Sequence, residues 1–231
     1  MKHLIKTADQ SGLASVNYNR VILNTTTDNV TIDYPYVDLG LPSGVKWAKC
    51  NIGATSETDY GDYFMWGSTT PNTASQCTWS NAPFNNGLDS YNEEYFNAHK
   101  SEWLDDNDNL KPEFDAASHI MGGDWKMPTK AEFQELLNGT TNEWIADYKG
   151  TGVSGRKFTS KSDTSKYIFI PAAGNRNDGS VGNVGNDGHV WSSSLDTSSH
   201  SSAWSLVFRS GGCGMYGNGR YGGQSVRGVR K

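Results

Sequence analysis

The stretch "MPTKAEFQELLNG" (Met127–Gly139) carries the clearest helix signal in the chain. Thr129 can cap a helix N-terminus with its hydroxyl group, and Glu132 three residues later completes a capping box. An apolar stripe with the spacing of one helix face follows, and Gly139 is a typical helix end. The residues of that stripe are Phe133, Leu136 and Leu137. The spacing therefore predicts an amphipathic helix capped by Thr129 and ended by Gly139.

On the N-terminal side of this helix the sequence keeps helical spacing, and on the C-terminal side it changes to short strand patterns. Upstream, "EFDAASHIMG" (Glu113–Gly122) has its apolar residues on one helix face and a glycine as the stop. "SYNEEYFNAHKSEWL" (Ser90–Leu104) could hold a short helix within the otherwise polar, loop-like residues 71–112. Downstream, short strands are predicted in "GRKFTS", "KYIFIPAAG", "HVWSSSL", "SAWSLVF" and "QSVRGVR". Two helices early and short strands late predict an α+β domain with small antiparallel sheets.

Residues 1–35 differ in composition from the rest of the chain. "VNYNRVIL" (Val16–Leu23) and "NVTIDY" (Asn29–Tyr34) alternate apolar and polar residues, and "NTTTDN" between them is a turn signal. We therefore expect an N-terminal β-hairpin extension over residues 1–35 and a ligand-binding domain over residues 36–231. The hairpin is either an arm for attachment or oligomerisation or an edge ribbon packed on its own domain.

Composition and charge restrict the class of protein. Of the 231 residues, 35% are hydrophobic and 12% aromatic, which predicts a core built from large rings. The net charge of −5 argues against nucleic acid as a partner. No apolar run approaches the roughly 20 residues that span a membrane, so no membrane insertion is expected. The first ten residues lack the apolar stretch of a secretory signal, which predicts no export by that route if Met1 is the native start.

The three cysteines, Cys50, Cys77 and Cys213, lack the spacing of a zinc site or a disulfide framework. Three free thiols are favoured, and one bridge stays open as the alternative. Two glycine-rich loops, "GNRNDGS" and "GNVGNDG", and the acidic run "DDNDN" resemble ion-binding loops without the full spacing of a phosphate loop or an EF-hand. Solvated polar turns are therefore expected, with no metal and no cofactor. The oxygens that calcium could use there belong to Asp178, Asn186 and Asp187.

Six motifs occur in a fixed order over residues 38–230. They are "DLGLPSGVKWA", "YGDYFMWG", "GGDWKMPTKAEFQELL", "IFIPAAGNR", "VWSSSL" and "GQSVRGVR". This set resembles the major paralogous domain family of gut bacteria, and the resemblance implies a C-type-lectin-like fold related to that of formylglycine-generating enzymes. The four motif tryptophans are expected in the core, Pro128 at the start of the helix, and Arg227 beside a carboxylate under the sheet. The tryptophans are Trp47, Trp66, Trp125 and Trp191.

The glycine-rich tail "GGCGMYGNGRYGGQSVRGVR" (Gly211–Arg230) raises a second resemblance. Several lineages of this fold are variable proteins of diversity-generating retroelements, in which randomised NNY codons exclude Lys, Glu, Gln, Trp and Met. Residues 192–223 contain no Lys, Glu or Gln, although these make up 25 of the 231 residues. Only Trp204 and Met215 are unreachable from such codons, and both lie where core anchors are expected. The alternative is an ordinary loop region rich in glycine and serine.

An alternating strand would turn Trp204, Leu206 and Phe208 inward and leave Ser205, Val207 and Arg209 outward. Tyr216 and Tyr221 are the best candidate anchors, and Arg209 and Arg220 can add charge-assisted hydrogen bonds. The predicted ligand-binding face comprises Asp196, Ser198, Ser199, His200, Ser201, Ser205, Val207, Arg209, Ser210, Gly211, Gly212, Cys213, Tyr216, Asn218, Arg220 and Tyr221.

The sequence therefore predicts a non-enzymatic binding protein with no catalytic residues. Its expected partner is a protein or glycan receptor on a cell surface, and its expected location is a virion or a cell surface, with a phage particle as a natural carrier. A homo-oligomer would strengthen a weak site through multivalency. One alternative is a fixed-surface adhesin or structural surface domain of a gut bacterium. The other is a formylglycine-generating-type oxidase, which would need a reactive Cys213.

Overall fold

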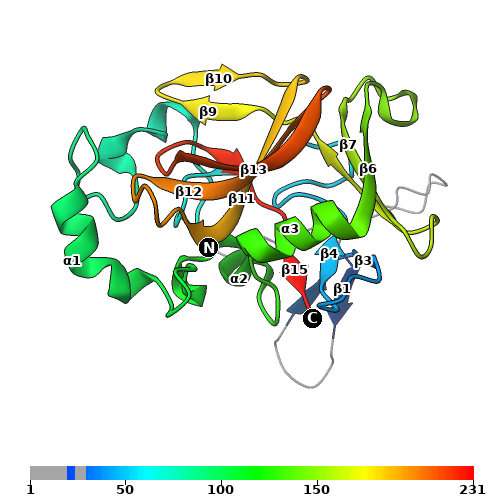
Figure 1. The fold of residues 1–231 in the computed structure, drawn as a ribbon, viewed down its shortest axis with the longest axis horizontal. Coiled ribbons are helices and arrows are strands. Elements are labelled where there is room, and N and C mark those ends of the chain that lie inside the picture. Colours follow the sequence, from blue (N-terminus) through cyan, green and yellow to red (C-terminus); the bar gives the residue numbers. More distant parts are fainter. Residues whose placement is uncertain (1–19, 24–29) are drawn as a thin grey trace.

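The computed structural model describes residues 20–23 and 30–231. Its central feature is a five-stranded sheet in the order β13-β12-β11-β14-β5, with helix α3 crossing beside it (Figure 1). The strands of this sheet are β5 (Tyr63–Phe64), β11 (Asp187–Leu195), β12 (Ser202–Arg209), β13 (Gly212–Gly219) and β14 (Gln224–Ser225). β11, β12 and β13 form an antiparallel meander, whereas β14 runs parallel to β11.

The pairing of β12 with β13 is regular along its whole length. Eight residue pairs run from Ser202↔Gly219 to Arg209↔Gly212 without a register shift. The β11–β12 pairing, in contrast, contains a shift between Trp191 and Leu195. The glycine-rich run, whose composition is typical of loops, is therefore an edge strand. Its backbone pairs with β12 along its whole length, and this pairing needs no large side chains.

Besides the N-terminal pair β1–β2, the described residues form three smaller sheets next to the central one. Two have three strands, and the third is the hairpin β9–β10. The three-stranded sheets are β6 (Thr140–Ile145), β7 (Gly155–Ser160) with β8 (Tyr167–Pro171), and β3 (Tyr36–Asp38), β4 (Lys46–Ala48) with β15 (Val229–Arg230). The hairpin strands are β9 (Asn175–Asn177) and β10 (Ser180–Gly182). β15 pairs with β4, so the two ends of the domain meet in one sheet.

Within the predicted N-terminal extension, the structure describes one pair of strands. β1 (Arg20–Leu23) and β2 (Val30–Asp33) pair antiparallel, from Arg20↔Asp33 to Leu23↔Val30. The turn predicted between them lies outside the described residues.

Three α-helices lie between β5 and β6, one more than the two expected. They are α1 (Glu93–Trp103), α2 (Ala116–Met121) and α3 (Lys130–Gly139). The short 3-10 turns η1 (Ala74–Gln76), η2 (Trp79–Asn81) and η3 (Pro112–Phe114) lie in the same part of the chain, and η4 (Tyr148–Gly150) follows β6. Asn92 caps α1 and Asp115 caps α2 through their side-chain oxygens. Helices and small sheets in one chain confirm the α+β class.

The capping box predicted for α3 is present. The Thr129 hydroxyl accepts from the Glu132 amide (3.2 Å), and the Glu132 carboxylate accepts from the Thr129 amide (2.7 Å). Pro128 precedes this cap rather than starting the helix. At the other end Gly139 is the last helical residue but does not break the chain, because β6 follows at once and the Thr140 hydroxyl donates to the Leu136 carbonyl (2.6 Å).

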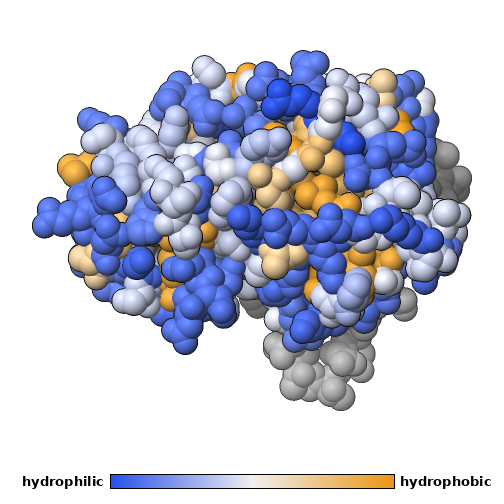
Figure 2. Space-filling model, in the orientation of Figure 1, coloured by the Kyte–Doolittle hydropathy of each residue, from blue (hydrophilic) through white to orange (hydrophobic). Residues whose placement is uncertain are grey.

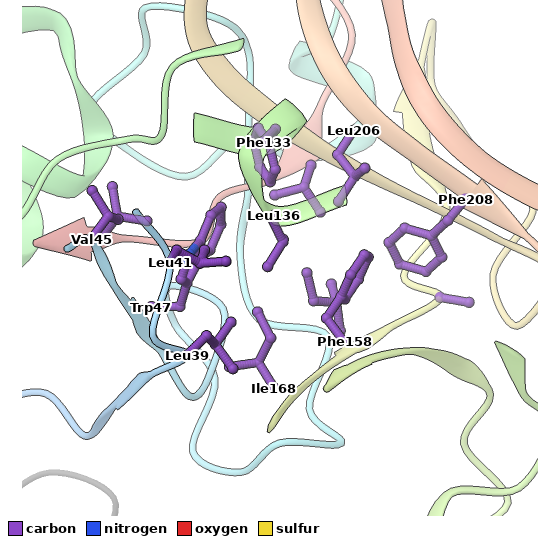
Figure 3. Packing of buried hydrophobic residues seen from close by; sticks show 14 residues of the cluster. Leu39, Leu41, Val45, Trp47, Phe133, Leu136, Phe158, Ile168, Leu206 and Phe208 are labelled. Atoms are coloured by element: carbon purple, nitrogen blue, oxygen red, sulfur yellow. The ribbon is translucent and has the colours of Figure 1, made fainter. Parts of the chain in front are cut away.

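The apolar face of helix α3 packs against the sheets. Phe133 and Leu136 are fully buried and point into the core, where Leu206 of β12 lies next to Phe133 (Figure 3) and Phe208 belongs to the same cluster. Burying such side chains contributes roughly 1.5–3 kcal/mol each. The third residue of the predicted stripe, Leu137, is only half-buried. The four motif tryptophans are all buried, as predicted.

Arg227 corrects one expectation about the core. Its side chain is fully buried, but its partners are the carbonyl oxygens of Ala48 (2.9 Å) and Phe169 (3.1 Å) and the Asn51 side-chain oxygen (3.0 Å), not a carboxylate. Burial lowers the pKa of Arg227 to about 10, which still leaves it charged at neutral pH. Backbone carbonyl groups of β4 and β8 accept the hydrogen bonds of the guanidinium group, so no acidic residue is needed beneath the sheet.

Candidate ligand-binding surface

The hairpin β12–β13 carries most of the residues predicted on the binding face. Its length separates two regions by roughly 24 Å. We call residues 209–212 the turn end, and residues 196–202 together with 219–223 the base end. Tyr216 and Asn218 lie between them. The predicted residues therefore form two groups rather than one patch.

A polar hollow of about 370 Å³ lies at the base end, lined by Tyr91, Glu93 and residues 197–201. Ser198 and Ser199 are exposed, and His200 and Ser201 are half-buried. His200 contacts the Asn97 side-chain oxygen through Nδ1 (2.7 Å). Hydroxyl, imidazole and carboxylate groups around one hollow can form many hydrogen bonds with a polar ligand.

Asp196 shapes this loop instead of facing a ligand, which corrects its predicted role. Its Oδ1 accepts hydrogen bonds from the Ser198 amide (3.0 Å) and the Ser198 hydroxyl (2.6 Å). A carboxylate that closes a turn in this way is drawn inward, and Asp196 is buried.

Arg220 is also buried, although the sequence predicts it as a surface donor. Its guanidinium donates to the His200 carbonyl (2.8 Å) and the Pro83 carbonyl (3.3 Å), so it ties the base-end loop to a distant segment. Burial lowers the pKa of Arg220 to about 10. Four rings surround the cation, which retains its charge through cation–π attraction. They are Phe96 at 4.1 Å, Tyr91 at 5.5 Å, and Trp66 and Trp79 at 5.8 Å from the guanidinium carbon.

Tyr221 belongs to a row of aromatic rings. It lies 5.0 Å from Trp79, and Trp79 lies 5.5 Å from Tyr91, measured between ring centroids. All three are half-buried. One side of the Tyr221 ring packs on Trp79 and helps to fix the loop, whereas the rest of the side chain is accessible at the surface.

Tyr216 is the most exposed ring of the predicted face, with 57% of its surface accessible. Ser205 and Val207, predicted outward beside it, are buried. The central position of β12 pairs both of its edges, and the burial of Ser205 and Val207 shows that the face which carries them is covered as well. Asn218 donates to the Ser205 hydroxyl (2.8 Å), which fixes the amide next to Tyr216.

The turn end is open. Arg209, Ser210 and Gly211 are exposed, and Gly212 is half-buried. The Arg209 carbonyl accepts a hydrogen bond from Arg156 Nη1 (3.0 Å), which holds the turn against β7. The backbone is therefore fixed while the side chains remain in solvent.

The glycines of the tail are not equivalent. At Gly211 and Gly212 an added Cβ would meet nothing within 4 Å. At four base-end and neighbouring positions an added Cβ would collide with packed atoms. These are Gly217 (2.6 Å from Asp196 Oδ2), Gly219 (2.8 Å from Tyr221 Cε1), Gly222 (2.8 Å from Asn177 Oδ1) and Gly223 (2.6 Å from Cys77 Sγ). Packing requires glycine most clearly at Gly223, where the Cys77 sulfur is fully buried and the Arg176 Cβ also lies within 3.1 Å. At the other three positions a side chain would have to shift, whereas the turn end has open space for a Cβ.

All three thiols are free, as the sequence favoured. Burial raises the pKa of Cys50 and of Cys213, and it raises the pKa of Cys77 to about 11. Cys213 donates to the Asn142 side-chain oxygen (3.1 Å). Reactive thiols need the thiolate form, which a raised pKa disfavours.

The acidic run "DDNDN" forms a hydrogen-bonded turn. Asp105 of the "DDNDN" run accepts from the amides of Asn107 and Asn109 (both 2.9 Å), which is the pattern of a polar turn. Among residues 20–23 and 30–231, no group of three or more His, Cys, Asp or Glu side chains could hold a metal ion. In the same part of the chain, no helix is long and apolar enough to cross a bilayer.

Sequence reasoning missed four residues that contact or line the base end: Trp79, Tyr91, Glu93 and Asn97. They lie about 100 residues or more upstream of residues 196–202, in the stretch expected to be polar and loop-like. Their aromatic content was the one available signal. Comparisons of the chain with protein-family models, with curated proteins and with solved structures found no match.

Proposed function

We propose that this chain is a non-enzymatic binding protein that recognises a protein or glycan receptor on a cell surface through its C-terminal hairpin. The observation that carries this proposal is the exposed Tyr216 ring on a rigidly paired strand. Tyrosine offers a large, stiff, amphipathic contact surface at a low cost in conformational entropy. The hollow at the base end adds hydroxyl groups and a carboxylate within the same hairpin region.

The finer fold assignment within this proposal is C-type-lectin-like. It rests on the six ordered motifs, and the burial of all four motif tryptophans supports it. A tryptophan-rich body that holds surface residues on a fixed backbone is suited to recognition.

Diversification by a retroelement belongs to the same proposal, with a phage particle or a cell surface as the carrier. The lack of Lys, Glu and Gln over residues 192–223 and the open glycines of the turn end support it. Reading the neighbouring DNA tests it: a reverse transcriptase gene and a near-copy of the 3′ end, differing at adenines, are expected. A locus with neither rules diversification out.

The crowded glycines favour the second candidate, an adhesin with a fixed surface. An added Cβ at Gly217, Gly219, Gly222 or Gly223 would force a neighbouring group to shift, so these positions vary less freely than the turn end. The oxidase alternative has less support, because burial raises the pKa of Cys213. It predicts that Cys213→Ser abolishes oxidation of a cysteine-containing peptide.

The receptor-binding proposal is tested with the labelled whole chain on a glycan array and on a panel of gut bacterial cells. Tyr216→Ala should weaken binding about tenfold or more without a change in Tm, because the ring makes few internal contacts. Tyr36→Ala is the matched control, since Tyr36 is 43% exposed but lies on β3. Binding that is absent on both surfaces, or equally reduced by both substitutions, contradicts the proposal. Tyr221→Ala should lower both affinity and Tm, because Tyr221 packs on Trp79.

A further inference from the structure

Strand β13 forms an open edge of the five-stranded sheet. One side of it pairs with β12 over eight residues. On its other side, residues 212–218 form no backbone hydrogen bond with another strand or loop in the described part of the chain, and only the Gly219 carbonyl is used, by the Gly222 amide (2.9 Å). Such an edge presents a row of N–H and C=O groups that can pair with a further strand.

This edge lacks the features that usually prevent pairing with another chain. Its sequence, "GCGMYGNG", contains no charged residue and no proline, and its register with β12 has no bulge. Natural edge strands are commonly protected by lysine, proline or a bulge. Glycine at four of the eight positions also lets another backbone approach closely.

A groove runs beside the edge, between α3 and the hairpin. It encloses about 520 Å³ and is lined by Lys130, Gln134, Leu137, Asn138, Trp204 and Met215. Figure 2 shows apolar side chains gathered between α3 and the strands next to it. Met215 and Trp204 turn into this groove from β13 and β12. Alternate side chains of a strand added to β13 would point to the same face and could enter it.

Charge distinguishes between possible occupants of this groove. The Lys130 ammonium lies 3.2 Å from the centroid of the Trp204 ring, and it forms no ion pair with any described residue. An occupant with a carboxylate would complement this cation. A second copy of β13 carries no carboxylate, so charge favours a segment of a different protein.

We propose that β13 binds an extended peptide segment of a partner protein as an added strand. One apolar side chain of the bound peptide fills the groove beside Leu137 and Met215, and an acidic side chain of the peptide pairs with Lys130. Backbone hydrogen bonds supply affinity, and the groove supplies specificity. Tyr216 lies on the same strand, but its side chain alternates to the face opposite Met215, so the groove and the receptor surface use different faces of β13. The N-methyl and Lys130 experiments below do not alter Tyr216, so the two proposals can fail separately.

The test begins with a displayed library of random peptides of about ten residues, selected on the whole chain. The expected peptides alternate apolar and polar residues and contain Asp or Glu. The best binder is then synthesised with N-methyl groups on alternate amides, in two phases, and measured by fluorescence polarisation. One phase should abolish binding and the other should preserve it, because only alternate amides face β13.

Two substitutions examine the charge. Lys130→Glu should weaken the acidic peptide about tenfold and improve its Glu-to-Lys derivative, whereas the exposed control Lys166→Glu should change neither. Lys130→Met should remove the preference for an acidic residue but keep the apolar contact. Circular dichroism and Tm verify that each variant folds.

Several outcomes overturn the proposal. They are a selection that enriches no peptide, binders with helical spacing, equal binding of both N-methylated phases, and unaltered charge preference in Lys130→Glu. A stable wild-type dimer in sedimentation velocity that excludes the peptide also overturns it, because a second copy would then cover the edge. Loss of receptor binding in Tyr216→Ala has no bearing on this result.

Discussion

The two ends of the hairpin β12–β13 have similar compositions but opposite roles. At the turn end, Gly211 and Gly212 have empty space around them and Arg209 extends into solvent. At the base end, Gly223 lies against the Cys77 sulfur and Arg220 is enclosed by four rings. The difference teaches that a glycine-rich segment is not uniformly free to vary. Packing on one side decides which glycines are required.

The largest expected effect is that of Arg220→Ala. The change removes hydrogen bonds to the His200 and Pro83 carbonyls and leaves a cavity among aromatic rings, so unfolding free energy should fall by about 3 kcal/mol. Urea unfolding measures it. Arg209→Ala at the turn end is the control and should stay within about 0.5 kcal/mol. Similar losses for both arginines would mean that the two ends do not differ.

The second-largest expected difference is in the reactivity of the thiols near the two ends. Cys77 is fully buried under Gly223 and its pKa is raised to about 11, whereas Cys213 near the turn end is half-buried. At pH 8 the raised pKa alone lowers the thiolate fraction of Cys77 about 100-fold relative to an ordinary thiol. Labelling with a chromogenic disulfide, followed by mass spectrometry, should modify Cys213 first. Early modification of Cys77 in the folded protein would show that the base end opens readily.

A smaller loss is expected for Gly223→Ala. The new Cβ would lie 2.6 Å from Cys77 Sγ and 3.1 Å from the Arg176 Cβ, so repacking should cost about 1–3 kcal/mol. Gly211→Ala is the matched control and should leave stability unchanged or slightly raised, because it restricts the unfolded chain. Thermal unfolding of both variants measures the difference. A tolerated Gly223→Ala would remove packing as the reason for that glycine.

The smallest loss of stability is expected at the turn end, even when several of its residues are substituted together. A library with NNY codons at residues 209–212 should retain folding in most members, because these side chains contact solvent. The same codons at residues 220–223 should leave few folded members. Protease resistance of displayed variants gives the two fractions. Equal fractions would break the distinction between the ends.

Local patterns were enough to predict the elements whose cause is local. The boundaries of α3 follow from the Thr129 and Glu132 capping box, and β7 matches "GRKFTS" residue for residue. Apolar periodicity also predicted the burial of Phe133 and Leu136, and the burial of the four tryptophans was expected from the ordered motifs that contain them. Strand β13 was missed, because glycine weakens every local strand signal and the pairing with β12 overrides it.

The candidate site was predicted only in part for a related reason. Tyr216 and the exposed serines of the base-end loop were correctly expected at the surface. Ser205, Val207, Asp196 and Arg220 were expected there too and are buried. Alternation along a strand assigns two faces but says nothing of what covers each face.

By itself the sequence determined the α+β class, the main helix with its caps and the aromatic core, since these depend on spacing and hydrophobicity along the chain. Tertiary structure alone decided which glycines are required, that Arg220 is a buried cation, and that Trp79 and Tyr91 join a loop more than 100 residues away. The physical reason is that burial, close approach and cation–π contact depend on neighbours in space, which folding brings together from distant segments.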